Sequence, residues 1–468
     1  MKNQYGKDGK SEEVNAREAA LKILYSIDAK GAYLNIAENE EFRKNPKATA
    51  KDKSFINELV FGVTENRILL DRIIMRFSKI KIKKMSVWVR NILRLGIYQI
   101  YFLDRIPESA ACNESVRLAK KYARRSSGFI NAVLRNAARK YADFGDLSGK
   151  SFEERAALFA GIENVKGGEY LSVVYSYPLW IAEKLIAQRG FEEAEKILKA
   201  SFERYAPFIR VNGLKYGRGE LIEKLKEENA DARIPDTAFL ADAAPGALEN
   251  CLEIHGGLDI YNSKLYGDGA YTLQNISSQL AVEVLDPKPG DTIIDACAAP
   301  GGKSTYIAEL MENRGEVLAF DIHEHKIELI KNAAKRLGID IIKAEACDAA
   351  GFIPELENKA DRVLADVPCS GLGVVHTKPD LKYAREAGDI EEIRRVQTDI
   401  LENVCRYVKD GGVLVYSTCT ILDEENGAQT DSFLSRHPEF TKTAEFKLDT
   451  YSCGGSGFYI CRMDKRDK

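Results

Sequence analysis

Histidine is scarce in this sequence: only five occur in 468 residues, and none belongs to an H-x-x-x-H pattern. The nine cysteines likewise form no C-x-x-C pair. Zinc sites are usually built from such spacings, so we expect no metal. The cysteine spacing also argues against a disulfide framework and favours reduced thiols, which are typical of the cytoplasm.

Long apolar segments are missing as well. The closest candidate, residues 87–103, is interrupted by Arg90 and Arg94, so no segment is expected to cross a membrane. The first ten residues are charged and have no apolar core, unlike a signal peptide. With 45% hydrophobic and 30% charged residues, the composition is that of a globular protein. The length allows about two to four domains.

Acidic residues are under-represented at the start of the chain. Residues 1–140 hold 29 Lys and Arg against 15 Asp and Glu, a net charge of +14, while the remaining residues carry −17. Solvated helix faces are also charged, but they do not require such an excess of one sign. A basic region joined to an acidic one predicts that the basic part contacts nucleic acid.

The spacing of apolar residues divides the chain into several regions. After a tail over residues 1–12, expected to be disordered, apolar positions recur every three or four residues, which predicts an all-α domain over 13–144. A linker over 145–164 precedes a small α+β domain over 165–260. In residues 261–468 short apolar strands alternate with helices, which predicts a parallel sheet covered on both faces.

One stretch of the last region has the form of a ligand-binding turn. From Asp291 to Ser304 it reads D-T-I-I-D-A-C-A-A-P-G-G-K-S: a strand, a tight loop and a helix N-terminus, whose N–H groups would face a ligand. It matches neither G-x-G-x-x-G nor a phosphate loop. Asp321, at the end of the next strand, suits a ribose diol. A nucleoside without a pyrophosphate fits both features, and S-adenosylmethionine is the candidate. For Gly301-Gly302 alone, an ordinary α/β turn remains the alternative.

The carboxyl ends of parallel strands lie along one rim of a sheet, where ligands bind. This rule places several polar residues together: Asp295, Asp321, Asp348, Asp366 and Thr418-Cys419. Cys369 follows Asp366 in a Pro-Cys-Ser-Gly turn. A single cysteine after a strand is usually a small buried hydrophobe, but two at the same rim point to chemistry. Which of them would attack is left open by their spacing, and the other seven keep the structural interpretation, except that Cys297 lies in the ligand turn.

Thiols, a carboxyl group and a methyl donor together suit methylation of cytosine at C5. This carbon is too weak a nucleophile by itself, but a thiolate that adds to C6 makes C5 enamine-like. A carboxyl group at N3 assists the addition, and the C5 proton must leave before the thiolate is eliminated.

Three motifs resemble the signatures of the RNA 5-methylcytosine methyltransferases. They are Asp295-Ala-Cys-Ala-Ala-Pro-Gly-Gly-Lys303, Asp366-Val-Pro-Cys-Ser-Gly371 and Tyr416-Ser-Thr-Cys-Thr420. The N-terminal region is similar to NusB-type RNA-binding domains in Leu93-Arg-Leu-Gly-Ile-Tyr-Gln99 and Phe129-Ile-Asn-Ala-Val-Leu-Arg135. This order of domains resembles the bacterial members that act on small-subunit ribosomal RNA. One departure is Val375-His-Thr-Lys-Pro-Asp380, where the family usually has a basic pair before the His.

The resemblance implies a fold and a role for each site residue. The fold is a NusB-like all-α domain, a small α+β RNA-binding or linking domain and a Rossmann-like methyltransferase domain. Cys419 would be the nucleophile, Cys369 would remove the proton and assist release, and Asp366 would hold the cytosine edge. Asp321 would bind the ribose and Asp348 the adenine side of S-adenosylmethionine. The remaining cofactor-binding residues would be Asp366 and the loop of Cys297, Ala298, Ala299, Pro300, Gly301, Gly302 and Lys303.

RNA, most directly 16S ribosomal RNA, is the expected partner, and a monomer is the expected state. Three other functions are compatible with parts of the chain. A small-molecule methyltransferase would give no role to the basic helical region. A non-catalytic RNA-binding or antitermination protein would leave the two cysteines and the carboxylates unexplained. A cytosine methyltransferase that acts on transfer RNA is the closest enzymatic alternative.

Overall fold

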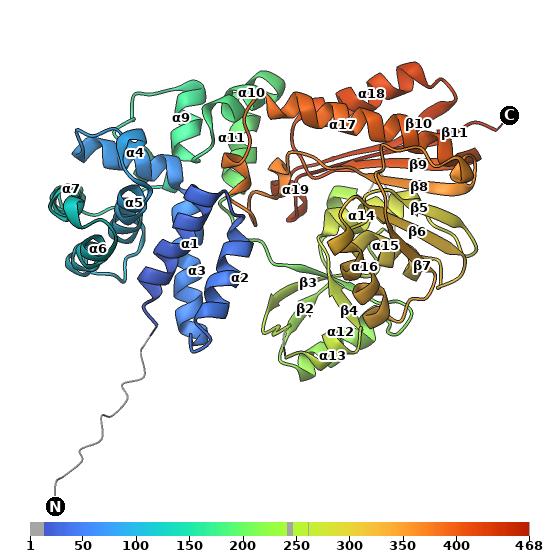
Figure 1. Cartoon of the computed structure of the whole chain (residues 1–468), viewed down its shortest axis with the longest axis horizontal. Helices are drawn as coiled ribbons and strands as arrows, with labels where there is room; N and C mark the ends of the chain where they lie inside the picture. Colours follow the sequence, from blue (N-terminus) through green and yellow to red (C-terminus); the bar gives the residue numbers. More distant parts are fainter. Residues whose placement is uncertain (1–13, 241–246, 261, 468) are drawn as a thin grey trace, which may run out of the picture. The chain divides into compact units, whose positions relative to one another are not determined.

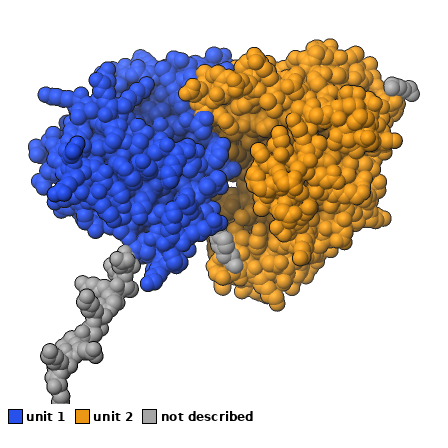
Figure 2. Space-filling model, in the orientation of Figure 1, with its two compact units in different colours: residues 1–198, 378–384 blue, residues 199–377, 385–468 orange. Residues whose placement is uncertain are grey.

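The computed structural model describes residues 14–240, 247–260 and 262–467, which form two compact units (Figure 2). The described part of unit 1 runs from residue 14 to residue 198 and includes the short segment 378–384. Unit 2 contains the other described residues. The tail expected over residues 1–12 lies outside the described residues.

The described part of unit 1 contains helices and turns and no strand (Figure 1). The α-helices are α1 (Ala16–Lys30), α2 (Leu34–Lys44), α3 (Ala50–Glu65), α4 (Arg67–Phe77), α5 (Val87–Phe102), α6 (Glu108–Tyr122), α7 (Ser127–Ala142), α8 (Phe152–Ala160), α9 (Gly167–Val174) and α10 (Leu179–Arg189); α11 (Phe191–Ala200) ends just beyond the unit. The all-α character that the periodicity predicts is therefore confirmed.

Helix α5 is the centre of unit 1 and packs against α1, α3, α4, α6 and α7. Its apolar sequence tolerates Arg94 because the buried guanidinium is paired on two sides. Nη1 donates to Oδ2 of Asp28 at 2.6 Å, and Nε donates to Oδ1 of Asp71 at 2.7 Å. Removing either carboxylate would leave a buried charge partly unpaired, which is costly. The arginine that interrupts the apolar run thus links α5 to α1 and α4.

The region expected to be a linker, residues 145–164, contains helix α8. A capping box starts this helix: Ser151 accepts from the N–H of Glu154, and the Glu154 carboxylate accepts from the N–H of Ser151. Phe159 then packs edge-on against Tyr101 of α5, with ring centroids 4.8 Å apart. The nine-residue helix has too few turns for a clear periodic pattern, and tertiary packing stabilises it.

The segment 378–384 packs within unit 1 although it is distant in the sequence. Oδ2 of Asp380 accepts the N–H of Leu34, at the start of α2. Nζ of the fully buried Lys382 donates to the carbonyl oxygens of Glu65 and Tyr175, at 2.9 and 3.3 Å. Burial lowers the pKa of Lys382 to about 7. Asp380, the last residue of the stretch that departs from the family pattern, therefore has a packing role.

Unit 2 begins with a small antiparallel sheet in the order β2-β3-β1-β4. Its strands are β1 (Phe208–Val211), β2 (Asp231–Arg233), β3 (Cys251–Gly256) and β4 (Tyr271–Leu273), with helices α12 (Arg218–Glu227) and α13 (Lys264–Gly267). The buried Arg210 of β1 connects this sheet to the next layer, because its guanidinium donates to the Glu309 carboxylate at 2.8 Å and to the carbonyl oxygen of Gly302.

A seven-stranded sheet in the order β10-β11-β9-β8-β5-β6-β7 forms the rest of unit 2 (Figure 1). Strands β5 (Thr292–Asp295), β6 (Glu316–Asp321), β7 (Ile342–Ala346), β8 (Ala360–Asp366) and β9 (Val408–Thr418) run parallel. Strands β10 (Phe440–Leu448) and β11 (Phe458–Lys465) add an antiparallel edge. The predicted α/β fold is thus confirmed, and β10 is an addition to it.

Helices cover both faces of this sheet, as Figure 1 shows. Helices α14 (Ile276–Leu285), α15 (Gly302–Leu310) and α16 (Glu324–Leu337) pack on one face, and α17 (Asp389–Val404) and α18 (Gly427–Arg436) pack on the other. The short helix α19 (Thr450–Cys453) precedes β11. In the described part of the chain, no helix is both long enough and apolar enough to span a bilayer.

Candidate active site

The loop between β5 and α15 has the predicted strand–turn–helix form. Gly301 has a φ of 103°, and a Cβ atom there would lie 3.0 Å from Cα of Ile330, so the turn requires glycine. The buried Asp295 precedes the loop and accepts a 2.6 Å hydrogen bond from the Ser304 hydroxyl. Burial raises the pKa of Asp295 to about 6. Its other oxygen, Oδ1, has no hydrogen-bond partner in the structure.

A cavity of about 280 Å³ opens beside this loop at the carboxyl ends of the strands. Its polar lining includes Asp321, Asp348 and Asp366, and its apolar lining includes Ile322 and Val396. Oδ1 of Asp321 accepts the N–H of His323, and Oδ1 of Asp348 accepts the N–H of Ala350, each at 3.0 Å. Three of the predicted carboxylates therefore lie around one cavity, with two of them oriented by their own turns.

A second cavity, of about 240 Å³, shares Cys297, Ala299 and Asp366 with the first. Lys303 lines it, and its Nζ donates to Oδ2 of Asp366 at 2.6 Å. Burial lowers the pKa of Lys303, but the groups around it, Asp366 first among them, together outweigh this effect and the net pKa is raised. Oδ1 of Asp366 accepts from the Ser417 hydroxyl at 2.7 Å. Asp366 is therefore an oriented anion at the border of both cavities.

Cys369 and Cys419 come together because β8 and β9 are adjacent and in register, with Asp366 opposite Ser417. Their Sγ atoms are 3.1 Å apart, and the N–H of Cys419 donates to Sγ of Cys369 at 3.3 Å. The hydrogen bond to Cys419 raises the pKa of the Cys369 thiol well above its usual value, and burial raises it further. Cys369 thus keeps its proton and can donate it to the Cys419 sulfur.

The other cysteines are mostly structural. Cys112, Cys251, Cys405, Cys453 and Cys461 are buried. Burial also raises the pKa of Cys297, so this thiol of the ligand loop is protonated. Cys347, for which we expected a purely structural role, lines the first cavity. Among the described residues, no three His, Cys, Asp or Glu side chains are grouped so that they could hold a metal ion.

The sequence gives little indication of one residue that joins the two cysteine turns. Glu425 ends the acidic run Asp423-Glu424-Glu425, a pattern typical of a solvated turn, yet it is fully buried. Its carboxylate accepts hydrogen bonds from Ser370 and Thr420, the residues that follow Cys369 and Cys419. Only the position of the run, separated by two residues from the Ser-Thr-Cys-Thr motif, could have drawn attention to it.

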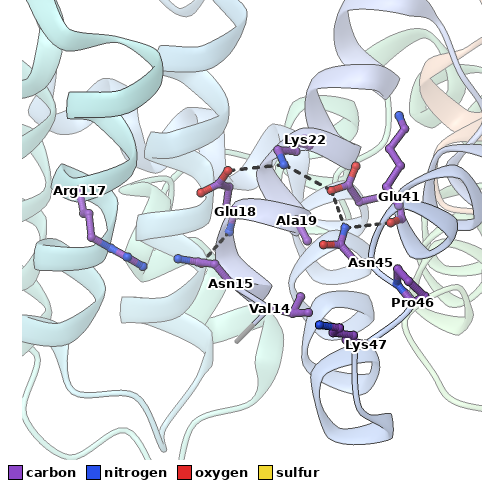
Figure 3. A pocket seen from close by; sticks show the side chains of 11 residues that line it. Val14, Asn15, Glu18, Ala19, Lys22, Glu41, Asn45, Pro46, Lys47 and Arg117 are labelled. Atoms are coloured by element: carbon purple, nitrogen blue, oxygen red, sulfur yellow. Dashed lines mark hydrogen bonds and ion pairs between the residues drawn. The ribbon is translucent and has the colours of Figure 1, made fainter. Parts of the chain in front are cut away.

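Unit 1 has a separate open hollow of about 590 Å³ (Figure 3). It is lined by Asn15, Glu18 and Lys22 of the α1 region, by Glu41 and Lys44 of α2, by Lys47, and by Arg117 of α6, among others. Nζ of Lys22 lies 3.5 Å from Oε1 of Glu18 and 3.6 Å from Oε1 of Glu41, so the charges of these two carboxylates are partly neutralised. The exposed cations at the rim are Lys44, Lys47 and Arg117.

Three family models match successive parts of the chain. Residues 14–139 match the NusB family, and residues 177–243 match a ferredoxin-like domain of RsmF/B-like methyltransferases. Residues 282–456 match the model described as 16S rRNA methyltransferase RsmB/F. The resemblances of the N-terminal and C-terminal regions seen in the sequence are thereby confirmed, as is the expected domain between them.

Curated proteins match over nearly the whole chain. The probable ribosomal RNA small subunit methyltransferase B of Bacillus subtilis is 34% identical, and the match covers 97% of this chain and 99% of that protein. The ribosomal RNA small subunit methyltransferase B of Klebsiella pneumoniae subsp. pneumoniae is 32% identical over 91% of each chain.

Solved structures share the fold. The crystal structure of PH0851 has a TM-score of 0.75 and 25% identity, and covers 97% of this chain and 99% of its own. NSun6 from Pyrococcus horikoshii with SFG has a TM-score of 0.53 and 25% identity, and covers 62% of this chain and 99% of its own.

Proposed function

Because this chain belongs to the RsmB/F family of 16S rRNA methyltransferases, we propose that it methylates C5 of a cytosine in small-subunit ribosomal RNA through a covalent bond between Cys419 and C6. The family membership itself establishes a methyltransferase of small-subunit ribosomal RNA that uses S-adenosylmethionine. One observation carries the finer proposal: two sulfur atoms lie 3.1 Å apart at the ends of adjacent parallel strands.

The residues of the first cavity, called the cofactor cavity from here on, fit S-adenosylmethionine. Asp321 would accept hydrogen bonds from the ribose, and Asp348 from the adenine side, while Ile322 and Val396 offer apolar surface to the ring. The loop from Cys297 to Lys303 would hold the methionine end. SFG, bound in the NSun6 structure, is an analogue of this cofactor. S-adenosylmethionine supplies an electrophilic methyl group.

The second cavity, called the base cavity from here on, suits the target cytosine. Its border carries Asp366, an acceptor that matches the N4 amino group of this base, and Lys303, whose Nζ donates to Asp366 and holds it in place. The ion pair fixes both side chains, so little reorientation is needed when the base enters. To reach this cavity the cytosine would leave its stack, as bases do in other enzymes that modify them.

The proton between the two sulfurs favours Cys419 as the nucleophile. The geometry allows either sulfur to donate. The raised pKa of Cys369 favours Cys369 as the thiol that keeps its proton and Cys419 as the sulfur that would accept the hydrogen bond. A thiolate is the attacking form of cysteine, and a thiol that donates to it stabilises its charge. Addition of Cys419 to C6 would make C5 nucleophilic toward the methyl group.

The same pair explains how Cys369 would act later. Once Sγ of Cys419 is bonded to carbon, its charge is gone and it no longer holds the Cys369 proton. The main cause that raises the pKa of Cys369 is then removed, so its thiol would release its proton to solvent and become a thiolate. It would take the C5 proton, and the electrons of the broken C–H bond would re-form the C5–C6 double bond and expel Cys419.

Bisulfite sequencing tests the proposed function, because 5-methylcytosine resists the deamination that converts cytosine. In a strain that lacks this gene, one cytosine of small-subunit ribosomal RNA is expected to lose its resistance. The wild-type gene should restore it, and a Cys419→Ala gene should not. Loss of resistance in transfer RNA alone, or in no RNA, would contradict the proposal.

A further inference from the structure

A buried carboxylate joins the two turns that carry the cysteines. Glu425 lies in the 3-10 turn Asp423–Glu425, between β9 and α18, and has no exposed surface. Oε2 accepts the N–H of Ser370 at 2.8 Å, and Oε1 accepts the Ser370 hydroxyl at 2.5 Å. Oε1 also accepts the Thr420 hydroxyl at 3.0 Å. One carboxylate therefore binds the residue after Cys369 and the residue after Cys419.

Further contacts close this connection into a network. The hydroxyls of Ser370 and Thr420 lie 2.7 Å apart, and Gln397 of α17 donates to Oε2 of Glu425 at 3.2 Å. The next residue, Asn426, donates to the carbonyl oxygen of Thr420 at 3.0 Å. In a buried network of this kind each side chain restricts the positions of the others, so its geometry is well defined.

The charge of Glu425 argues against a role in activating the thiols. An anion disfavours a thiolate nearby, and Glu425 is one of the groups that raise the pKa of Cys369, after the hydrogen bond to Cys419 and burial. A residue that acted on the thiols through charge alone would hinder the reaction. Its contacts with Ser370 and Thr420 instead determine where the two turns lie.

We propose that Glu425 is a positioning residue, whose carboxylate holds the Cys369 turn and the Cys419 turn at the distance that lets both sulfurs act in sequence on one cytosine. This inference rests on the proposed function for its role in catalysis. Misplacement of a reacting atom by about 1 Å costs on the order of 100-fold in rate, so such a distance is worth fixing.

Glu425→Gln is the most direct variant, because it preserves size while one acceptor oxygen becomes an NH₂ donor that faces the donors of Ser370 or Thr420. We expect kcat to fall about 10- to 100-fold while KM for S-adenosylmethionine stays within about twofold. Glu424→Gln, in the same turn but partly exposed, is the matched control and should retain both constants. Thermal melting and cofactor calorimetry confirm that each variant is folded.

Phenylarsine oxide reports the sulfur spacing without RNA or methyl transfer. Its arsenic binds two neighbouring thiols and releases one water, so wild-type protein should bind it across Cys369 and Cys419, and Cys369→Ala or Cys419→Ala should lose this binding. Glu425→Gln should weaken it by about tenfold or more, whereas Glu424→Gln should not. If Glu425→Gln does not fold, Thr420→Val removes one of the same hydrogen bonds and should give a smaller loss of the same kind.

Two outcomes overturn the positioning role. In one, the Glu425→Gln protein binds the arsenical with wild-type affinity but has a reduced kcat. In the other, its arsenical affinity and its kcat both equal the wild-type values. A third outcome separates this inference from the proposed function. If Glu425→Gln weakens arsenical binding but even the wild-type protein forms no 5-methylcytosine, the spacing role stands and the proposed reaction is wrong.

Discussion

The cofactor cavity and the base cavity adjoin each other but are built in different ways. In the cofactor cavity, Asp321 and Asp348 are oriented by N–H groups two residues further along the chain. In the base cavity, Lys303 meets Asp366 from 63 positions away. In the turns that follow Asp366 and Ser417, Cys369 meets Cys419 from 50 positions away. Groups that bind are thus oriented by local turns, and groups that react are oriented by contacts between residues far apart in the sequence.

This difference has an energetic consequence. Loss of a carboxylate held by its own turn removes hydrogen bonds to the ligand and disturbs little else. Loss of one member of a partly buried ion pair leaves its partner with an unmatched charge in the site. Substitutions in the cofactor cavity should therefore mainly weaken binding, and substitutions at the base cavity should mainly slow the reaction.

The largest of the three effects below is expected at Asp366. Asp366→Asn removes the anion that fixes Lys303 and faces the base, so kcat should fall about 100- to 1,000-fold, the usual range for a group that acts on a proton or a charge in the transition state. Steady-state methylation of ribosomal RNA measures it. Asp361→Asn, near the other end of β8, is the control. An equal loss in cofactor affinity would instead place Asp366 mainly in the cofactor cavity.

A smaller and different effect is expected at Asp321. Asp321→Ala should weaken S-adenosylmethionine binding by about 1–3 kcal/mol, as for a lost polar partner, and leave kcat at saturating cofactor within about threefold. Calorimetry gives the dissociation constant. Glu324→Ala, in the first turn of α16, is the control and should bind normally. An unchanged dissociation constant for Asp321→Ala would remove this residue from the site and end the contrast between the cavities.

The smallest effect is expected in unit 1, at the rim of its hollow. If the basic helical unit contacts RNA phosphates, Lys47→Ala with Arg117→Ala should reduce the slope of log affinity against log salt by about 1 to 2, because each neutralised phosphate releases counterions. Filter binding over a salt series measures the slope. The exposed pair Lys226→Ala with Lys288→Ala, from unit 2, is the charge-matched control. Equal slopes for both double variants would mean that this rim does not bind RNA.

What could be predicted from the sequence follows the same division. The strand, turn and helix around Gly301 were readable because each depends on neighbouring residues. The same is true of α5, which lies within the apolar segment 87–103 of the region predicted to be all-α. The meeting of Cys369 and Cys419 at one rim also followed, because a parallel sheet gathers the ends of its strands.

The features that escaped prediction depend on distant partners. Strand β10 is an edge strand that exposes alternate residues and has an irregular register near Lys442, so its apolar pattern is weak. Helix α8 is too short to show a period. In the sequence Glu425 resembles an exposed charged residue, and its burial becomes evident only when the turns of Cys369 and Cys419 are placed in space. Each of these features depends on contacts between residues far apart in the sequence, which no local pattern indicates.

The most direct test of the account is the fate of the covalent bond in the two cysteine variants. With RNA and S-adenosylmethionine, Cys369→Ala should still attack but not release, and should accumulate a protein–RNA adduct that survives denaturing electrophoresis. Cys419→Ala should form no adduct and no 5-methylcytosine. A stable adduct with Cys419→Ala, and none with Cys369→Ala, would contradict the account and make Cys369 the nucleophile.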